Sequence, residues 1–245
     1  MATKLDLSGA RAKLKWSDNQ ITILSTQIAA FMAQNVTEFR PDPKGEMRRA
    51  TLYRNDALVP DDIKTATGMI IQAQRDSLDH LIVALARKNG AVKMTVPEFP
   101  ICDSETRFAD KGTLRKIGSL SDIDQAAVMA LKPYKGGNNL LYALHWLSNK
   151  SKHRDLVTAM HHPISATFTN TGVIGHVRKV TIHKGKGPDG EPMAVVSVDA
   201  DPQIKLNLSH AVSFREIPEA GSQPVIETLR NFSKLAREII DGFDV

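Results

Sequence analysis

Hydrophobic residues recur at helical spacing through the first two thirds of the chain and alternate with polar residues over most of the remainder. The helical pattern predicts one long helix over residues 8–34 and a second over residues 65–88. Clear boundary signals flank the second helix, because Pro60-Asp61-Asp62 is a typical helix start and Asn89-Gly90 a typical end.

The helix at residues 65–88 is apolar on more than one side. Its widest apolar stripe consists of Ile70, Ile71, Leu78, Leu81, Ile82 and Leu85. The opposite side carries His80 among Met69, Ala73 and Ala84. Since a helix with two apolar sides is usually buried on both, we expect this helix to lie at the centre of the fold.

Three later segments also have helical periodicity. Residues 113–131 are expected to form one broken helix or two short ones. A further helix is predicted from Asn138 or Asn139, either of which can cap it, to about Met160, and a closing amphipathic helix over residues 225–243.

Alternating patterns predict the strands. Four strands are expected in an antiparallel sheet, at residues 164–170, 172–183, 193–199 and 206–217. Two shorter strands at residues 36–40 and 47–53 flank a turn-rich segment, which favours a hairpin, although a loop is the alternative.

Helices followed by a run of strands are typical of an α+β fold rather than of alternating βαβ units. We therefore predict a helical bundle with an appended antiparallel β-sheet. The predicted domains are residues 1–162, the bundle with a short hairpin insertion, and residues 163–245, the sheet plus the closing helix. The closing helix could also return to the bundle, which would make the two parts one unit.

The composition is that of a globular protein with a mild excess of basic residues. The 245 residues are 42% hydrophobic, and 32 Lys and Arg against 27 Asp and Glu give a net charge of +5. This balance fits a phosphate-bearing partner, but the excess is spread along the chain, and an ordinary solvated surface is the favoured interpretation.

Cys102 is the single cysteine, so the sequence gives no sign of an oxidising compartment. The first residues carry charges without an apolar segment, and the longest apolar stretch, residues 21–33, is interrupted by polar residues. We therefore expect a cytoplasmic protein with no membrane association.

Residues 75–80, Arg-Asp-Ser-Leu-Asp-His, place an arginine, a polar residue and a histidine in one helix. This arrangement resembles the motif of the HEPN superfamily, small helical proteins that include many metal-independent ribonucleases. The resemblance implies a homodimer in which Arg75 and His80 of both protomers line one cleft. Asp76, which occupies the polar position of the motif, completes the catalytic set that the resemblance implies.

The chemistry of these side chains suits RNA cleavage. Histidine both takes and gives a proton near neutrality, so His80 would act as general acid or base. A guanidinium stays charged and donates two parallel hydrogen bonds, so Arg75 would hold the scissile phosphate. The alternative is structural, since Arg75 with Asp79 and Asp76 with His80 are spaced for ordinary ion pairs along a helix.

A second resemblance covers residues 60–155. The segments 75–81, 98–101 and 147–154 look like the landmarks of a widespread group of uncharacterised bacterial proteins. This resemblance implies a shared fold and brings no activity with it.

Basic and polar residues gather near the end of the predicted helix at 138–160. The predicted nucleic-acid-binding residues are His145, Asn149, Lys150, Lys152, His153 and Arg154. Four of them, at positions 145, 149, 152 and 153, share one helix face. They either contact the RNA backbone or form a solvated basic helix end that suits the helix dipole.

Metal binding is less favoured, because no carboxylate or cysteine joins His145 and His153 at a familiar ligand spacing. The chain also lacks a glycine-rich phosphate loop and a nucleophile elbow, so we expect no metal and no cofactor. The sequence thus predicts a cytoplasmic, metal-independent endoribonuclease, in a defence or toxin role, that acts on RNA as a homodimer. A non-catalytic module binding nucleic acid or protein is the alternative, and a purely structural scaffold is a third; whether an antitoxin or other protein partner exists stays open.

Overall fold

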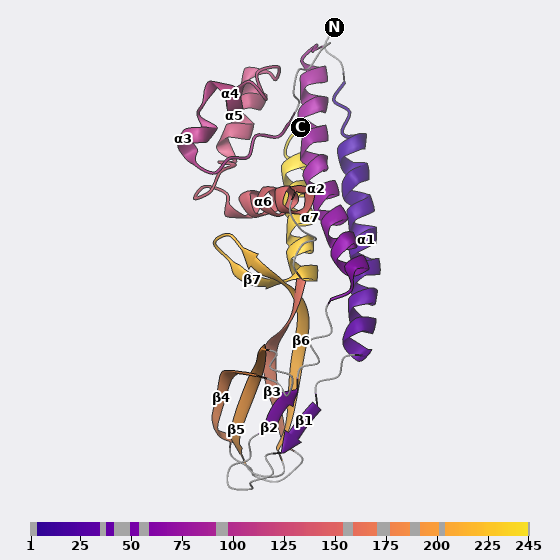
Figure 1. Cartoon of the computed structure of the whole chain (residues 1–245). Helices are drawn as coiled ribbons and strands as arrows, with labels where there is room; N and C mark the ends of the chain where they lie inside the picture. Colours follow the sequence, from indigo (N-terminus) through magenta and orange to yellow (C-terminus); the bar gives the residue numbers. More distant parts are fainter. Residues whose placement is uncertain are drawn as a thin grey trace. The chain divides into compact units, whose positions relative to one another are not determined.

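The computed structural model describes residues 4–34, 38–41, 50–53, 59–91, 98–153, 159–170, 177–186, 192–200 and 204–244 (Figure 1). Their side chains are described at 4–33, 59–91, 98–151, 211–214 and 217–244. The fold is α+β, and the chain forms two compact units. Unit 1 comprises Met1–Gln27, Val59–Met160 and Ser213–Val245, and unit 2 comprises Ile28–Leu58 and His161–Val212.

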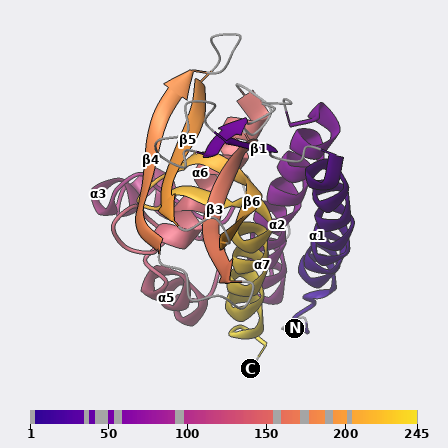
Figure 2. The ribbon, with the colours of Figure 1, turned by 90° about the horizontal axis from the view of Figure 1, so that it is seen from below.

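Helices make up most of unit 1. The long ones are α1 (Ser8–Gln34), α2 (Asp61–Lys88), α6 (Asn139–His153) and α7 (Val225–Asp241). The short ones are α3 (Glu105–Phe108), α4 (Lys111–Leu114) and α5 (Asp122–Ala130). Helix α2 packs against α6 and α7, and α1 lies alongside α2 (Figures 1 and 2). The predicted central position of α2 is therefore confirmed.

Helix α2 begins and ends at the predicted signals. Pro60 stands before its first turn, which contains Asp61 and Asp62, and Gly90 follows its end with a φ of 84°. The predicted apolar stripe is fully buried; Ile71, Leu78 and Leu81, for example, have no exposed surface. The opposite side differs from the expectation, because His80 is exposed and Met69 is 56% exposed. The expected burial of α2 on both sides is thus wrong at these positions.

Helix α6 is shorter than predicted. It is described as far as His153, residues 154–158 lie outside the described residues, and Met160, the predicted end, lies in strand β3 (Ala159–Asn170). The apolar stripe of the helix stops at Leu147, since Ser151 occupies the next position on that face. A helix gains most of its stability by burying such a stripe, so the helical periodicity alone overestimated its length.

Several elements of unit 1 are short. Residues 113–131 form parts of α4 and α5, which confirms the alternative of two short helices. Helix α3 and strand β7 (Gly221–Pro224) were not predicted. Both are only four residues long, which is too short for a periodic pattern to appear.

Unit 2 contains most of the β-structure. Strand β1 (Glu38–Pro41) pairs antiparallel with β2 (Ala50–Tyr53), which confirms the predicted hairpin. Strand β4 (Val177–Lys186) pairs antiparallel with β5 (Pro192–Ala200), with Val180 opposite Val198. A third sheet has the order β3-β6-β7, where β6 is Ile204–Ile217 and continues into unit 1. The sequence predicted two domains that meet at residue 162. Whether the two parts of the chain fold independently there stays a prediction.

No helix among the described residues is both long enough and apolar enough to cross a membrane.

A tight turn sets the start of α6. Asn138 donates its main-chain N–H to the carbonyl of Lys132, and its side-chain oxygen accepts the N–H of Leu141, which confirms the predicted cap. Gly137 lies inside this turn, where an added Cβ would come within 2.5 Å of the Lys132 carbonyl oxygen and 2.8 Å of the Tyr134 ring. The turn therefore requires glycine at this position.

We expect Gly137→Ala to lower the free energy of unfolding by about 1–3 kcal/mol, because a main-chain atom must move to make room for the methyl group. Gly112→Ala is the matched control, since nothing lies within 4 Å of its added Cβ. Chemical denaturation measures both variants. Equal stability of the two would contradict the close packing of this turn.

Candidate functional site

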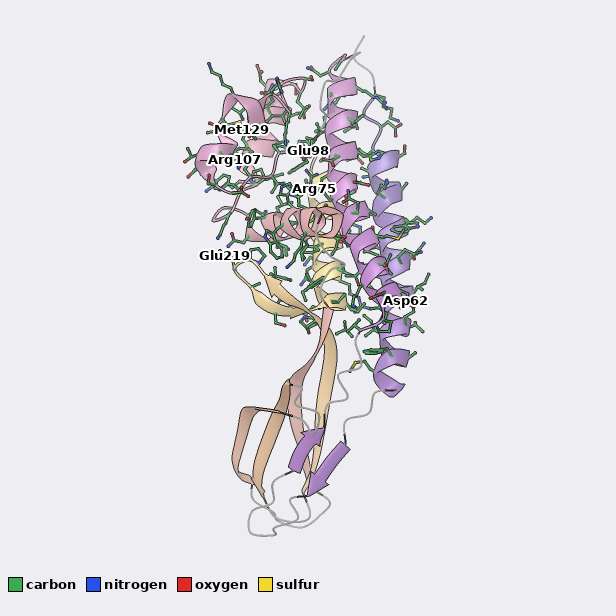
Figure 3. All side chains as sticks on the ribbon, in the orientation of Figure 1. Asp62, Arg75, Glu98, Arg107, Met129 and Glu219 are labelled. Carbon is green, nitrogen blue, oxygen red and sulfur yellow. The ribbon has the colours of Figure 1, made fainter. Side chains whose placement is uncertain are left out.

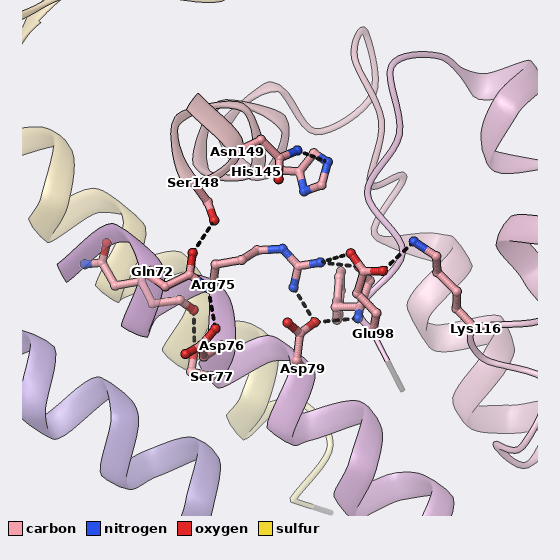
Figure 4. Close-up of polar contacts among 12 residues, drawn as sticks. Gln72, Arg75, Asp76, Ser77, Asp79, Glu98, Lys116, His145, Ser148 and Asn149 are labelled. Carbon is pink, nitrogen blue, oxygen red and sulfur yellow. Dashed lines mark hydrogen bonds and ion pairs between the residues drawn. The ribbon is translucent and has the colours of Figure 1, made fainter. Parts of the chain in front are cut away.

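Arg75 of α2 is buried and holds the segment that follows the helix. Its side chain donates to Asp79 Oδ1 at 2.5 Å and to the main-chain carbonyl oxygen of Phe99 at 2.7 Å (Figure 4). Asp79 Oδ1 in turn accepts the main-chain N–H of Phe99 at 2.8 Å. The ion pair thus satisfies both polar main-chain groups of Phe99, whose side chain is fully buried. We call this arrangement the Phe99 clamp.

Glu98 extends the clamp towards the surface. Its Oε1 lies 3.3 Å from an Arg75 nitrogen, and its Oε2 accepts from Lys116 Nζ at 2.6 Å. Burial acts to raise the pKa of Glu98, but Lys116 and Arg75 outweigh it and hold this pKa below its usual value. For Asp79, burial has the larger effect and raises the pKa in spite of Arg75.

Helix α6 brings His145 and Asn149 to the other side of this cluster. Leu141, Leu144 and Leu147 of the same helix are buried. The Asn149 Nδ2 lies 2.9 Å from the His145 Nε2 (Figure 4), so the predicted shared face is confirmed for this pair. An amide nitrogen only donates, so in this contact the Nε2 of His145 accepts. The proton of the neutral imidazole therefore lies on Nδ1.

His145 is neutral near pH 7. Burial lowers its pKa to about 4, and the neighbouring positive charge of Arg75 acts in the same direction, against an opposing effect of Glu98. A partly buried imidazole with one free proton and one lone pair accepts or donates hydrogen bonds without adding charge.

A cleft of about 790 Å³ opens beside this pair, and three cations line it. Lys116 follows α4, Lys111 begins it, and Arg107 lies on α3. Two acids, Asp103 and Asp110, also line the cleft, so the charges at its wall sum to +1. Figure 3 shows Arg107 in the α3–α5 region and Arg75 and Glu98 beside α2.

Of the other predicted nucleic-acid-binding residues, none that the structure describes lines this cleft. Lys150 lies over the Trp146 ring, with Nζ 4.6 Å from the ring centroid. Lys152 and His153 belong to α6, but their side chains lie outside the described residues, as does Arg154 altogether.

The structure does not bring Arg75 and His80 together within one protomer. Arg75 is 2% exposed in the Phe99 clamp, whereas His80 is exposed on the α1 side of α2, next to Gly9. Asp76 lies on the same side as His80, where it accepts from Lys13 and Gln72. The structural pairing of Arg75 with Asp79 is confirmed, and the catalytic role of Arg75, Asp76 and His80 stays a prediction.

The cations at positions 107, 111 and 116 were not among the sequence candidates. They are spread over ten residues that contain no recognisable motif, and only the tertiary fold brings them to one cleft. The sequence did point to Glu98, because it is the first residue of the segment 98–101 that resembles the group of uncharacterised bacterial proteins. Among the residues that the structure describes, no three His, Cys, Asp or Glu side chains form a group that could hold a metal ion.

No protein-family model, no curated protein and no solved structure matches the chain.

We expect Arg75→Ala to lower the free energy of unfolding by about 1–3 kcal/mol, because it leaves the main-chain carbonyl of the buried Phe99 without its hydrogen-bond donor and the partly exposed Asp79 without its ion-pair partner. The matched control is Arg107→Ala, which removes an exposed arginine from a similarly spaced pair with Asp103. That change should cost about 0.5 kcal/mol or less. A small loss for Arg75→Ala, measured by denaturant unfolding, would contradict the clamp.

The low pKa of His145 predicts a pH dependence of stability. Unfolding returns the pKa of this group to its ordinary value of 6.5, so between pH 6.5 and about 4 the unfolded chain binds the extra proton. The free energy of unfolding should therefore fall as the pH is lowered through this window. His145→Gln should fall less steeply there, and parallel curves for the two proteins would show that the pKa of His145 is not depressed.

Proposed function

We propose that this protein binds RNA, and that the cleft between α6 and the α3–α4 segment holds the phosphate backbone. The observation that carries the proposal is the gathering of Arg107, Lys111 and Lys116 around one cleft with a neutral histidine. Phosphate contacts by lysine and arginine supply sequence-independent affinity.

The partners of the three cations differ, which indicates which one is most available. Lys116 is engaged with Glu98, and Arg107 lies 3.3 Å from Asp103. Lys111 is exposed and makes no ion pair with another described residue. Lys111 is therefore the cation that a phosphate can reach without breaking an existing pair.

His145 and Asn149 give the cleft a way to favour RNA over DNA. The ribose 2′-hydroxyl both donates and accepts, and it is the group that distinguishes the two polymers. A neutral imidazole and an amide offer both roles at the same place. Binding that depends on these two side chains should therefore be weaker for DNA of the same sequence.

A second candidate function is metal-independent RNA cleavage, as the resemblance to HEPN ribonucleases implies. His145 supports it, since an uncharged imidazole lines the cleft with Lys116; to take a proton it would have to exchange the Asn149 contact at Nε2 for the substrate hydroxyl, while a cation stabilises the charge that develops on phosphate. Arg75 and His80 would act on one substrate only if a second protomer completed the site. The homodimer, the defence or toxin role and the cytoplasmic location belong to this proposal and rest on the sequence.

Binding is tested by fluorescence anisotropy with a labelled single-stranded RNA and DNA of the same sequence. Lys111→Glu should weaken RNA binding by about tenfold, and the slope of log affinity against log salt should become shallower. Lys234→Glu is the matched control, because Lys234 is an exposed lysine on α7 outside the cleft. Equal weakening by both variants would mean that net charge alone drives binding.

Cleavage is tested with the same RNA in excess EDTA, comparing the wild type with His145→Ala and His80→Ala. Products with 2′,3′-cyclic phosphate ends that disappear only in His145→Ala would place the chemistry in the cleft. Loss in His80→Ala instead would favour the HEPN arrangement. Intact RNA with all three proteins, combined with normal binding, would leave RNA binding as the function and reject the second candidate.

A further inference from the structure

A second concave surface lies along α1 and α2, outside the cleft. The two helices run antiparallel here, since Gly9 lies against His80 and Lys13 contacts Asp76. The groove between them has a volume of about 640 Å³. Small-molecule sites of proteins are typically about 300–1,000 Å³, mostly apolar, with a few placed polar groups.

The lining of the groove has this character. Ala12 and Ala73 contribute little side chain, which leaves room between the helices. Trp16 and Met69 line the same groove and are 39% and 56% exposed. An exposed tryptophan beside an apolar groove offers a face on which a flat ring can stack.

The carboxylate of Asp76 is held in position at this groove. Ser148 of α6, which is buried, donates to Gln72 Oε1 at 2.8 Å, and Gln72 Nε2 donates to Asp76 Oδ1 at 2.5 Å (Figure 4). The hydrogen bonds from Ser148 to Gln72 and from Gln72 to Asp76 therefore hold Oδ1 in place. Oδ2 makes only a longer contact of 3.2 Å with the partly exposed Lys13. This oxygen is free to accept further hydrogen bonds from a ligand.

The charges and polar groups of the groove restrict the class of ligand. Lys13 and Asp76 balance each other, so the groove favours an uncharged molecule. Its polar side chains supply both donors and acceptors, namely Lys13, Asp76 and His80. A flat, neutral heterocycle with both kinds of group at its edge matches these features better than a purely apolar ligand or an ion.

We propose that this groove binds a guanine base, stacked on Trp16 and paired through its Watson–Crick edge with Asp76. Guanine presents two adjacent donors, the N1–H and the 2-amino group, to a single carboxylate. Adenine instead presents the N1 lone pair, which a carboxylate repels. Lys13 and His80 lie on the same groove and can donate to the O6 and N7 acceptors of guanine.

The base can belong to a free nucleoside or to RNA, and the chemistry of recognition is the same. Single-stranded RNA is commonly read by stacking unpaired bases on aromatic residues and bonding their edges. The proposal goes beyond backbone binding in the cleft and does not depend on it, because a free nucleoside carries no phosphate.

Tryptophan fluorescence provides a direct test. The chain has two tryptophans, so Trp146→Phe leaves Trp16 as the only one. Guanosine added to this variant should quench the fluorescence of Trp16, and the quenching should saturate below about 1 mM. Excitation at the red edge of the tryptophan absorption band avoids absorption by the nucleoside. Inosine, which lacks the 2-amino group, should bind about tenfold more weakly, and adenosine more weakly still.

Two further substitutions in this background identify the site. Asp76→Asn should abolish the preference for guanosine over adenosine. Ala12→Leu, which fills the groove from an exposed position on α1, should remove quenching by all nucleosides, whereas the exposed Ala30→Leu on the same helix should not. Circular dichroism confirms that each variant is folded.

An oligouridylate with one central guanosine, compared with one carrying adenosine, separates the two sources of the base. Selective quenching by the guanosine oligomer supports the groove as a base site of RNA, and quenching by guanosine alone supports a free nucleoside. The proposal is overturned if guanosine does not quench Trp16, or if Asp76→Asn and Ala12→Leu bind it as the parent does. Failure here leaves the anisotropy test of the cleft unaffected.

Discussion

The ion pair between Arg75 and Asp79 is the interaction on which the arrangement of the candidate site depends. Burying a guanidinium costs several kcal/mol unless it is paired and hydrogen-bonded, and the main chain of Phe99 completes its partners. The segment fixed in this way continues to Cys102, whose main chain bonds to Pro133 and Lys135 in the turn before α6. One buried pair on α2 thus holds the segment that in turn holds the start of α6, and it places Glu98 against Lys116.

The sequence was most informative where a local signal decides the structure. The limits of α2 follow from Pro60 and Gly90, and the Arg75–Asp79 pair follows from helical spacing. The partners of Arg75 outside its own helix could not be predicted in this way. Phe99 lies 24 residues away, and every residue type has the main-chain carbonyl that Arg75 contacts. The exposure of His80 was not predicted either. Alanines next to a histidine occur both on buried helix faces and beside open grooves, so the sequence does not distinguish the two.

Helix α2 separates two surfaces with different chemistry. On one side Arg75 contacts Glu98 and, through it, Lys116 of the charged cleft, and on the other α2 and α1 form an electrically balanced groove with an exposed tryptophan. The contact of Ser148 with Gln72 joins them, because Ser148 is adjacent to Asn149 on α6 and Gln72 holds Asp76. An RNA that met both surfaces would have its backbone and one base recognised by separate groups, which is how many RNA-binding proteins divide affinity and specificity.

The most direct test of RNA binding in the cleft is the imidazole ¹⁵N spectrum of the protein during titration with a short oligouridylate, which lacks guanine. The account predicts that His145 is neutral and protonated on Nδ1 in the free protein at pH 7. Its signals should then shift on addition of RNA while those of His80 stay in place. An unchanged His145 with a responding His80 would contradict the account and move the RNA site to the opposite side of α2.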